Sequence, residues 1–171
     1  YVLPYYDFSK NFLNNKFARF NLTSRGDNIL KDTNSLRSRM INDLEIQSDD
    51  YFSNGGVKTN FNYYLKNTIS AGKNNVEYNS SPHVKFMNIF EITSGYPLMN
   101  ISENFIDQLN PKLSLRINPS DMKGYQNENR EINSENMFDV NRLGLIDTLE
   151  SGQNLTLGLD YKKEKINDIN K

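Results

Sequence analysis

Charged residues gather in one short stretch near the C-terminal end of the chain, where Arg142, Asp147 and Glu150 lie close together. Two neighbouring carboxylates could act as the acid and the nucleophile of a glycoside hydrolase, but a three-residue spacing beside a turn does not support the separation that this reaction needs. A guanidinium near carboxylates favours paired hydrogen bonds instead. We therefore expect a network of Arg116, Arg142, Asp147 and Glu150 that holds a loop in place; the alternative is a solvated hairpin flank.

Composition excludes several other kinds of chemistry. The chain has no Cys and one His, so thiolate chemistry and a histidine metal cluster are not available. Asp49 and Asp50 precede a glycine turn but lack the ligand spacing of a calcium loop. The net charge of −1 gives no field that would attract nucleic acid. We expect no enzyme activity, no cofactor, no metal and no nucleic-acid partner.

The sequence predicts that β-strands position these residues. The sequence has 27 Asn and two Ala, which argues against helices, and no apolar run is long enough for a membrane-spanning helix. Apolar and polar residues alternate with period two, as in Leu36, Met40 and Leu44 against Arg37 and Arg39. We predict an all-β, antiparallel fold with about eight strands. The predicted strands are 2–8, 16–24, 35–48, 57–71, 84–100, 109–118, 138–144 and 154–164.

Turn residues separate the predicted strands, and two prolines interrupt them. Glycine and asparagine supply the positive φ that tight turns require. The residues expected at turns are Asn54, Gly55, Gly56 and Gly152. Pro4 and Pro111 lie inside strand-like runs, and because proline cannot donate to a ladder, each marks a strand start or a bulge.

Strand length separates two possible architectures only partly. Several runs alternate over more residues than the five or six that are usual in soluble sheets, and a tilted strand needs about 9–11 residues to cross a bilayer. A transmembrane barrel turns its apolar face to lipid, whereas a soluble sandwich turns it to a second sheet. The alternation fits both, so both stay open at this point. In the barrel, the residues would form an open curved sheet that is part of a larger barrel.

Two blocks of sequence carry a resemblance to a known family. The first is YVLPYYDFS at the start, and the second runs from residue 109 to 161 and contains PKLSLR, NRLG, ESG and LTLG in that order. This pattern closely resembles the barrel domain of the LptD family, the lipopolysaccharide-assembly proteins of Gram-negative outer membranes. The similarity extends over residues 1–171 and is strongest over 109–161.

The resemblance implies a function and partners. Family members insert lipopolysaccharide into the outer leaflet, so this chain would be an interior part of such a barrel, forming wall and a lumen or loop element. The partners implied are lipopolysaccharide, an LptE-like plug lipoprotein, the periplasmic Lpt bridge through a separate N-terminal domain, and outer-membrane lipid. The implied location is the cell outer membrane. The cysteines that form the family's disulfides have no counterpart here.

Two other functions remain as alternatives at this level. One is another outer-membrane barrel, such as a porin or a receptor, and the other is a soluble β-sandwich that binds carbohydrate. Continuity of the apolar stripe discriminates between them. An outward band across all strands fits a barrel, and a stripe that meets a second sheet fits a sandwich.

Overall fold

The computed structural model describes residues 2–15, 17–31, 34–76, 78–122 and 131–166, and these contain nine strands and no helix. The all-β class is therefore confirmed. The strands are β1 (Val2–Asn15), β2 (Ala18–Lys31), β3 (Ser35–Ser48), β4 (Tyr51–Phe52), β5 (Lys58–Lys73), β6 (His83–Gly95), β7 (Leu98–Ile101), β8 (Phe105–Asn118) and β9 (Gly152–Lys165).

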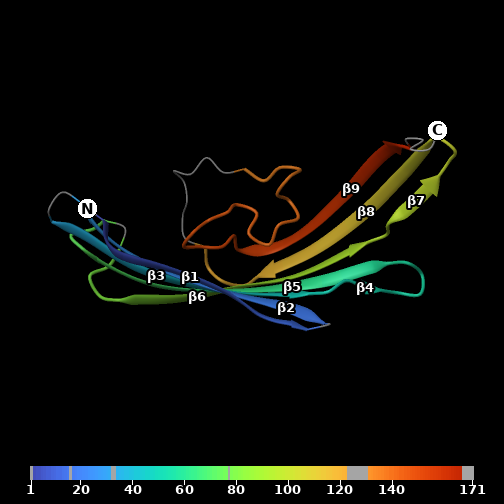
Figure 1. Cartoon of the computed structure of the whole chain (residues 1–171). Helices are drawn as coiled ribbons and strands as arrows, with labels where there is room; N and C mark the ends of the chain where they lie inside the picture. Colours follow the sequence, from blue (N-terminus) through green and yellow to red (C-terminus); the bar gives the residue numbers. More distant parts are fainter. Residues whose placement is uncertain (1, 16, 32–33, 77, 123–130, 167–171) are drawn as a thin grey trace.

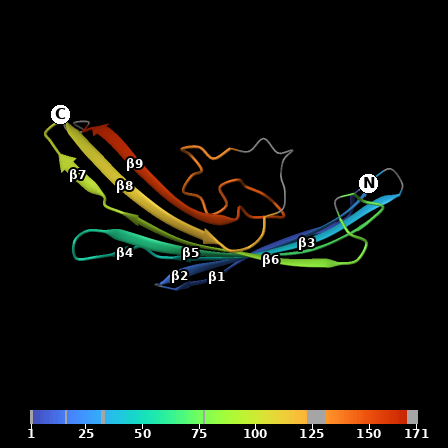
Figure 2. The ribbon, with the colours of Figure 1, turned by 180° about the vertical axis from the view of Figure 1, so that it is seen from behind.

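The strands form one antiparallel sheet that follows chain order. Its order is β1-β2-β3-β5-β6-β8-β7, while β4 pairs with β5 and β9 pairs with β8. The pairing of β2 with β3 runs without a shift from Ala18 opposite Ser48 to Lys31 opposite Ser35. The sheet is bent into a trough, and residues 131–151 lie in the hollow of the trough (Figures 1 and 2). We call residues 131–151 the inner segment.

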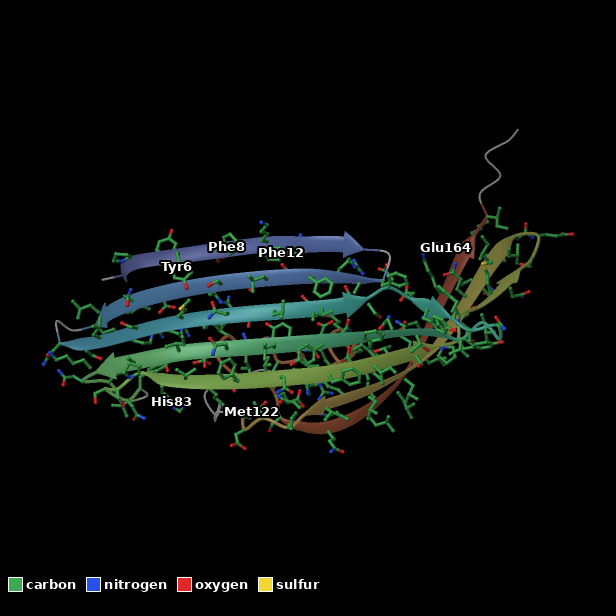
Figure 3. All side chains as sticks on the ribbon, turned by 90° about the horizontal axis from the view of Figure 1, so that it is seen from below. Tyr6, Phe8, Phe12, His83, Met122 and Glu164 are labelled. Carbon is green, nitrogen blue, oxygen red and sulfur yellow. The ribbon has the colours of Figure 1, made fainter. Side chains whose placement is uncertain are left out.

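The two faces of the sheet differ sharply in character. On the convex face, apolar side chains are exposed along every long strand except β2, where they are half-buried. Figure 3 shows Tyr6, Phe8 and Phe12 following one another along β1. Neighbouring strands continue this face, because Leu44 lies opposite Leu65 and Leu115 lies opposite Leu155. The exposed apolar side chains of the face include Tyr6, Phe8, Phe12, Met40, Phe61, Val84, Phe86, Phe90, Leu113, Leu115, Leu155, Leu157, Leu159 and Tyr161.

The concave face carries most of the ionic side chains, and Lys10, Asp107 and Lys163 are among the exceptions on the convex face. Alternation places Arg37, Arg39 and Asp43 on this side of β3, and their cross-strand partners are also mostly polar. Many of them are buried, although they are charged, because the inner segment covers the middle of the hollow. The predicted separation of an aliphatic from an ionic stripe on β3 is therefore present in the sheet.

A row of polar side chains interrupts the convex face. The Ser24 hydroxyl donates to Asn42 Oδ1 at 2.6 Å, and Asn42 Nδ2 donates to Asn67 Oδ1 at 3.1 Å. Asn67 Nδ2 in turn donates to the Lys85 carbonyl at 3.4 Å. Four strands thus satisfy these polar groups among themselves.

One predicted strand is wrong, and others have different bounds. Residues 138–144 form turns in the inner segment instead of a strand, because their apolar side chains pack onto the sheet. The strand expected over 84–100 is broken at residues 96–97 into β6 and β7. Both β1 and β2 run about seven residues further than expected at their C-terminal ends, whereas β3 has its expected bounds.

The turn residues and prolines occupy distinctive positions. The Gly56 amide donates to the Ser53 carbonyl at 3.0 Å, and Gly56 has φ +83, so the 53–57 segment with Asn54 and Gly55 is a tight hairpin between β4 and β5. Gly152, with φ +97, starts β9.

Both prolines lie inside strands. Pro4 falls in the register shift between β1 and β2. Pro111 pairs regularly with Leu159 on β9, but on its other side it faces the break between β6 and β7, where Tyr96 donates to its carbonyl. A residue without an N–H fits a position where the neighbouring ladder is interrupted.

Candidate functional site

The inner segment is attached to the sheet by a small apolar cluster. Leu149 is fully buried against Met87 and Ile89 of β6, and Tyr64 and Val140 pack against the same group. Two more leucines of the segment, Leu143 and Leu145, are also buried. Burial of each such side chain is worth roughly 1.5–3 kcal/mol, so the segment is part of the core of the fold.

Arg142 and Glu150 form a two-pronged ion pair within the inner segment. Arg142 Nε donates to Glu150 Oε2 at 3.0 Å, and Arg142 Nη2 donates to Oε1 at 2.5 Å. Both side chains are largely buried. The pair joins the two ends of the turn between residues 142 and 150, and its planar geometry fixes the turn's shape.

Arg116 connects this pair to the sheet. The residue, on β8, is 2% exposed, and its guanidinium donates to the carbonyls of Val140 at 3.2 Å and Glu150 at 3.1 Å. Its Nη1 lies 3.7 Å from Glu150 Oε2. Asn118, two residues further along β8, also donates to the Glu150 carbonyl, at 2.7 Å. The structure thus brings three of the four predicted network residues into one cluster.

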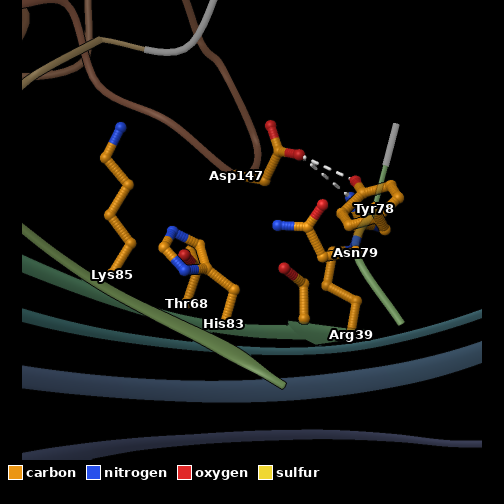
Figure 4. A pocket seen from close by; sticks show the side chains of 8 residues that line it. Arg39, Thr68, Tyr78, Asn79, His83, Lys85 and Asp147 are labelled. Carbon is orange, nitrogen blue, oxygen red and sulfur yellow. Dashed lines mark hydrogen bonds and ion pairs between the residues drawn. The ribbon is translucent and has the colours of Figure 1, made fainter. Parts of the chain in front are cut away.

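Asp147, the fourth, lies apart from that cluster. Its Oδ2 accepts a hydrogen bond from the Tyr78 hydroxyl at 3.0 Å and lies 4.0 Å from Arg39 Nη1 (Figure 4). Arg39 is held mainly by Asp27, to which it donates twice, at 3.1 and 2.7 Å. Asp147 therefore extends the attachment of the inner segment across the trough to β3.

A buried lysine gives a third point of attachment that sequence reasoning did not select. Lys66 of β5 is 0% exposed; its Nζ lies 2.6 Å from Asp43 Oδ1 and donates to the Ile146 carbonyl at 2.9 Å. A buried ammonium needs both a counter-charge and hydrogen bonds. Lys66 has both, and one of its acceptors comes from the inner segment.

A second buried pair was also missed. Glu91 of β6 is buried, and Asn62 Nδ2 donates to its Oε1 at 3.1 Å. In the sequence, Lys66 and Glu91 look like ordinary residues of a polar strand face. The available signal was Met87 and Ile89, which make the otherwise polar concave face of β6 apolar at two positions, as expected where another segment covers that face.

Two searches covered the residues that the structure describes, one for metal-binding groups and one for membrane-spanning helices. In the described part of the chain, no group of three or more His, Asp or Glu side chains could hold a metal ion. The described segments also contain no helix that is long and apolar enough to span a membrane. Ion pairs and hydrogen bonds connect the inner segment to the sheet.

The chain matches no protein-family model, and no match to a curated protein was found.

Proposed function

We propose that this chain forms part of the wall of an outer-membrane β-barrel of the lipopolysaccharide-assembly type. In this proposal, the convex face contacts lipid, the concave face lines the lumen, and the inner segment is a loop folded into that lumen. The observation that carries the proposal is the continuous band of exposed aliphatic and aromatic side chains across the convex face, opposite a concave face rich in charge.

The exposure of the band is too large for an ordinary water-facing surface. Leu155, Leu157 and Leu159 of β9 are 66%, 71% and 64% exposed, and they lie beside Leu113 and Leu115 of β8. Contiguous apolar patches on soluble proteins are usually covered by a partner or a membrane. None of the residues that the structure describes covers this one.

Strand length supports the same proposal. Seven strands of the sheet, β1, β2, β3, β5, β6, β8 and β9, have at least 13 residues. A tilted strand needs about 9–11 residues to cross the hydrocarbon core. The strands would therefore span a bilayer and extend beyond it.

The polar row on the convex face is compatible with lipid contact. Polar groups in hydrocarbon must find partners within the protein, because no water is there to replace them. Ser24, Asn42 and Asn67 bond to one another in a chain, which meets this requirement.

The lipopolysaccharide cargo rests on the resemblance of residues 109–161. These residues include most of β8, the whole inner segment and most of β9, and hence the cluster of Arg116, Arg142 and Glu150. A wide lumen with side chains of both signs suits passage of a large hydrated anion, because neither sign dominates.

The rival functions differ in what they require of the convex face and of the cargo. A soluble carbohydrate-binding sandwich would require a second sheet over the convex face. A porin or receptor would have the same lipid-facing barrel wall as the proposed lipopolysaccharide-assembly protein. It would differ only in the substance that passes through the lumen.

Cysteine scanning tests the orientation of the wall, and the chain has no native Cys to interfere. Spin labels at Leu157→Cys on the convex face and Thr156→Cys on the concave face would be compared in lipid bilayers. We expect the first label to be accessible to oxygen in the lipid and the second to a water-soluble nickel complex. Equal access of both labels to the nickel complex would contradict the proposal that the convex face contacts lipid.

A cellular experiment tests the cargo separately. The protein is depleted in its own cells, and newly made lipopolysaccharide is measured at the cell surface. We expect surface lipopolysaccharide to fall while its synthesis continues. If surface lipopolysaccharide is unchanged and uptake of small solutes falls, the wall belongs to a porin or receptor.

A further inference from the structure

A polar cavity of about 260 Å³ lies on the concave face between the sheet and the tip of the inner segment (Figure 4). Its lining comes from strands β3, β5 and β6, from the connection between β5 and β6, and from the inner segment. The lining residues are Arg39, Thr68, Ser70, Tyr78, Asn79, His83, Lys85 and Asp147.

The cavity has more basic than acidic groups. Arg39, His83 and Lys85 line it against a single carboxylate, that of Asp147. Arg39 is already bound to Asp27. Within the described residues, no hydrogen bond or ion pair involves the side chains of Lys85 or His83. Two basic side chains of the cavity thus remain available to a ligand.

Asp147 marks where an oxyanion binds in this cavity. Its carboxylate accepts the Tyr78 hydroxyl at 3.0 Å and faces the Arg39 guanidinium at 4.0 Å. The Asp147 carboxylate belongs to the inner segment. The groups that face it belong to the sheet side of the cavity: the Arg39 guanidinium to β3 and the Tyr78 hydroxyl to the connection before β6. The cavity therefore already holds one oxyanion, supplied by the protein itself.

The remaining donors suit a larger oxyanion than a carboxylate. The Lys85 ammonium, the His83 ring and the hydroxyls of Thr68 and Ser70 line the same space. Ammonium and hydroxyl donors around a tetrahedral anion are typical of phosphate sites. A phosphate has more acceptor oxygens than a carboxylate, and Lys85 and Arg39 approach it from different strands.

We propose that this cavity binds a phosphate group and that Asp147 competes with it as an internal anion. Phosphate would contact Lys85, His83 and Arg39, and it would repel or displace the Asp147 side chain. The inference does not depend on the proposed function, because residues of this chain build the cavity whatever passes through the lumen.

Binding would be measured by calorimetry on the intact protein in detergent micelles, with inorganic phosphate, glucose 6-phosphate and glucose as separate probes. We expect both phosphates to bind and glucose not to bind. Tighter binding of inorganic phosphate would indicate that the natural ligand is free phosphate, and tighter binding of glucose 6-phosphate would indicate a phosphate carried by a sugar. Failure of both phosphates to bind would overturn the proposal.

Variants connect the binding to the cavity. Lys85→Gln and His83→Gln should each weaken phosphate binding by about tenfold, since each replaces a basic donor with a neutral amide that donates more weakly to the anion. Lys112→Gln is the matched control, because Lys112 lies on the same concave face but lines a different cavity. Unchanged affinity in Lys85→Gln, in protein that retains its far-ultraviolet circular dichroism, would overturn the site.

Asp147→Asn tests the competition. The variant keeps the size of the side chain and removes its charge, so phosphate should bind more tightly than to the parent protein. Weaker binding would show that Asp147 supports the ligand and would overturn its role as a competitor.

Discussion

Glu150 is the residue on which the cluster at β8 depends. It faces the guanidinium groups of both Arg116 and Arg142, and all three side chains are largely buried. Removing one partner of a buried ion pair leaves the other charge without compensation, which costs more than the pair itself contributes. Glu150 neutralises two such charges at once.

Glu150→Ala should therefore lower the free energy of unfolding by about 3–5 kcal/mol. Urea titration of protein folded in detergent or bilayers would measure the change. Glu135→Ala is the control, because Glu135 lies exposed on the same inner segment. Equal stability of the two variants would contradict the role of the cluster.

Asp50 gives a prediction about pH at the hairpin before β5. Lys58 Nζ lies 2.8 Å from Asp50 Oδ2, and Asn60 Nδ2 donates to Oδ1 at 3.0 Å. The hydrogen bond from Lys58, followed by that from Asn60, holds the pKa of the Asp50 carboxyl below its usual value. Because the folded pKa is the lower one, the pair stabilises the hairpin above the unfolded pKa, near pH 4, and this contribution is lost as the pH falls through the folded pKa.

An NMR titration of the Asp50 carboxyl would check this. In Lys58→Ala, the pKa of Asp50 should move up toward its ordinary value, whereas Lys112→Ala should leave it where it is. An Asp50 pKa that does not respond to Lys58→Ala would contradict the pairing.

Sequence alone grouped Arg142, Asp147 and Glu150, because opposite charges near one turn are easy to recognise, and it added Arg116 from the strand before them. It did not select Lys66, because a lysine on the polar face of a strand is normally solvated. Only the position of the inner segment decides that Lys66 is buried and that Asp147 meets Arg39. Contacts between distant parts of the chain leave no local pattern.

At the scale of elements, the inner segment packs closely onto β9 at one glycine. A Cβ at Gly158 would lie 2.6 Å from two ring atoms of Phe138. The absence of a side chain at Gly158 therefore lets the aromatic ring of Phe138 lie directly on the strand.

Gly158→Ala should displace Phe138 and destabilise the fold by about 1–3 kcal/mol, as overpacking does. Hydrogen exchange of residues 136–142 should become faster. Gly55→Ala is the control, since a Cβ there would meet only Ser53 Oγ at 3.9 Å. Unchanged exchange in Gly158→Ala would show that Phe138 does not anchor the segment.

Most strands could be predicted from alternation because each has one apolar and one polar face. The prediction of 138–144 as a strand failed because Phe138 and Val140 alternate with polar residues in a loop. This loop packs its apolar side chains against the concave face of the sheet. The two-residue strand β4 is too short to show any period. Alternation identifies a segment with two unlike sides, and a packed loop can have them as well.

At the scale of the whole molecule, the convex band predicts how charge is tolerated in a membrane. Leu157→Arg would place a guanidinium among lipid chains, whereas Thr156→Arg, on the adjacent residue, would place it in the hollow. The first should cost roughly 2–4 kcal/mol near the bilayer midplane, and the second should cost much less. Equilibrium unfolding in bilayers would measure both, and equal costs would contradict the orientation of the wall.

Alternation along the strands predicted that the sheet has two unlike faces, but not which of them is concave. Curvature comes from the sheet as a whole and from the segment packed in its hollow. The sequence likewise left open a soluble sandwich, since the same stripe could have met a second sheet. The exposed apolar band on the convex face favours the barrel wall over the soluble sandwich.

The order of the strands has a consequence for how the protein assembles. All strands after β1 except β4 and β7 lie beside the strand that precedes them in the chain, so most of the sheet can grow by adding each strand to its predecessor. The bond from Lys66 to Ile146, by contrast, joins residues 80 positions apart. Closing so long a loop favours late formation. The trough should therefore be built stepwise while it is still empty, and docking of residues 131–151 should complete it.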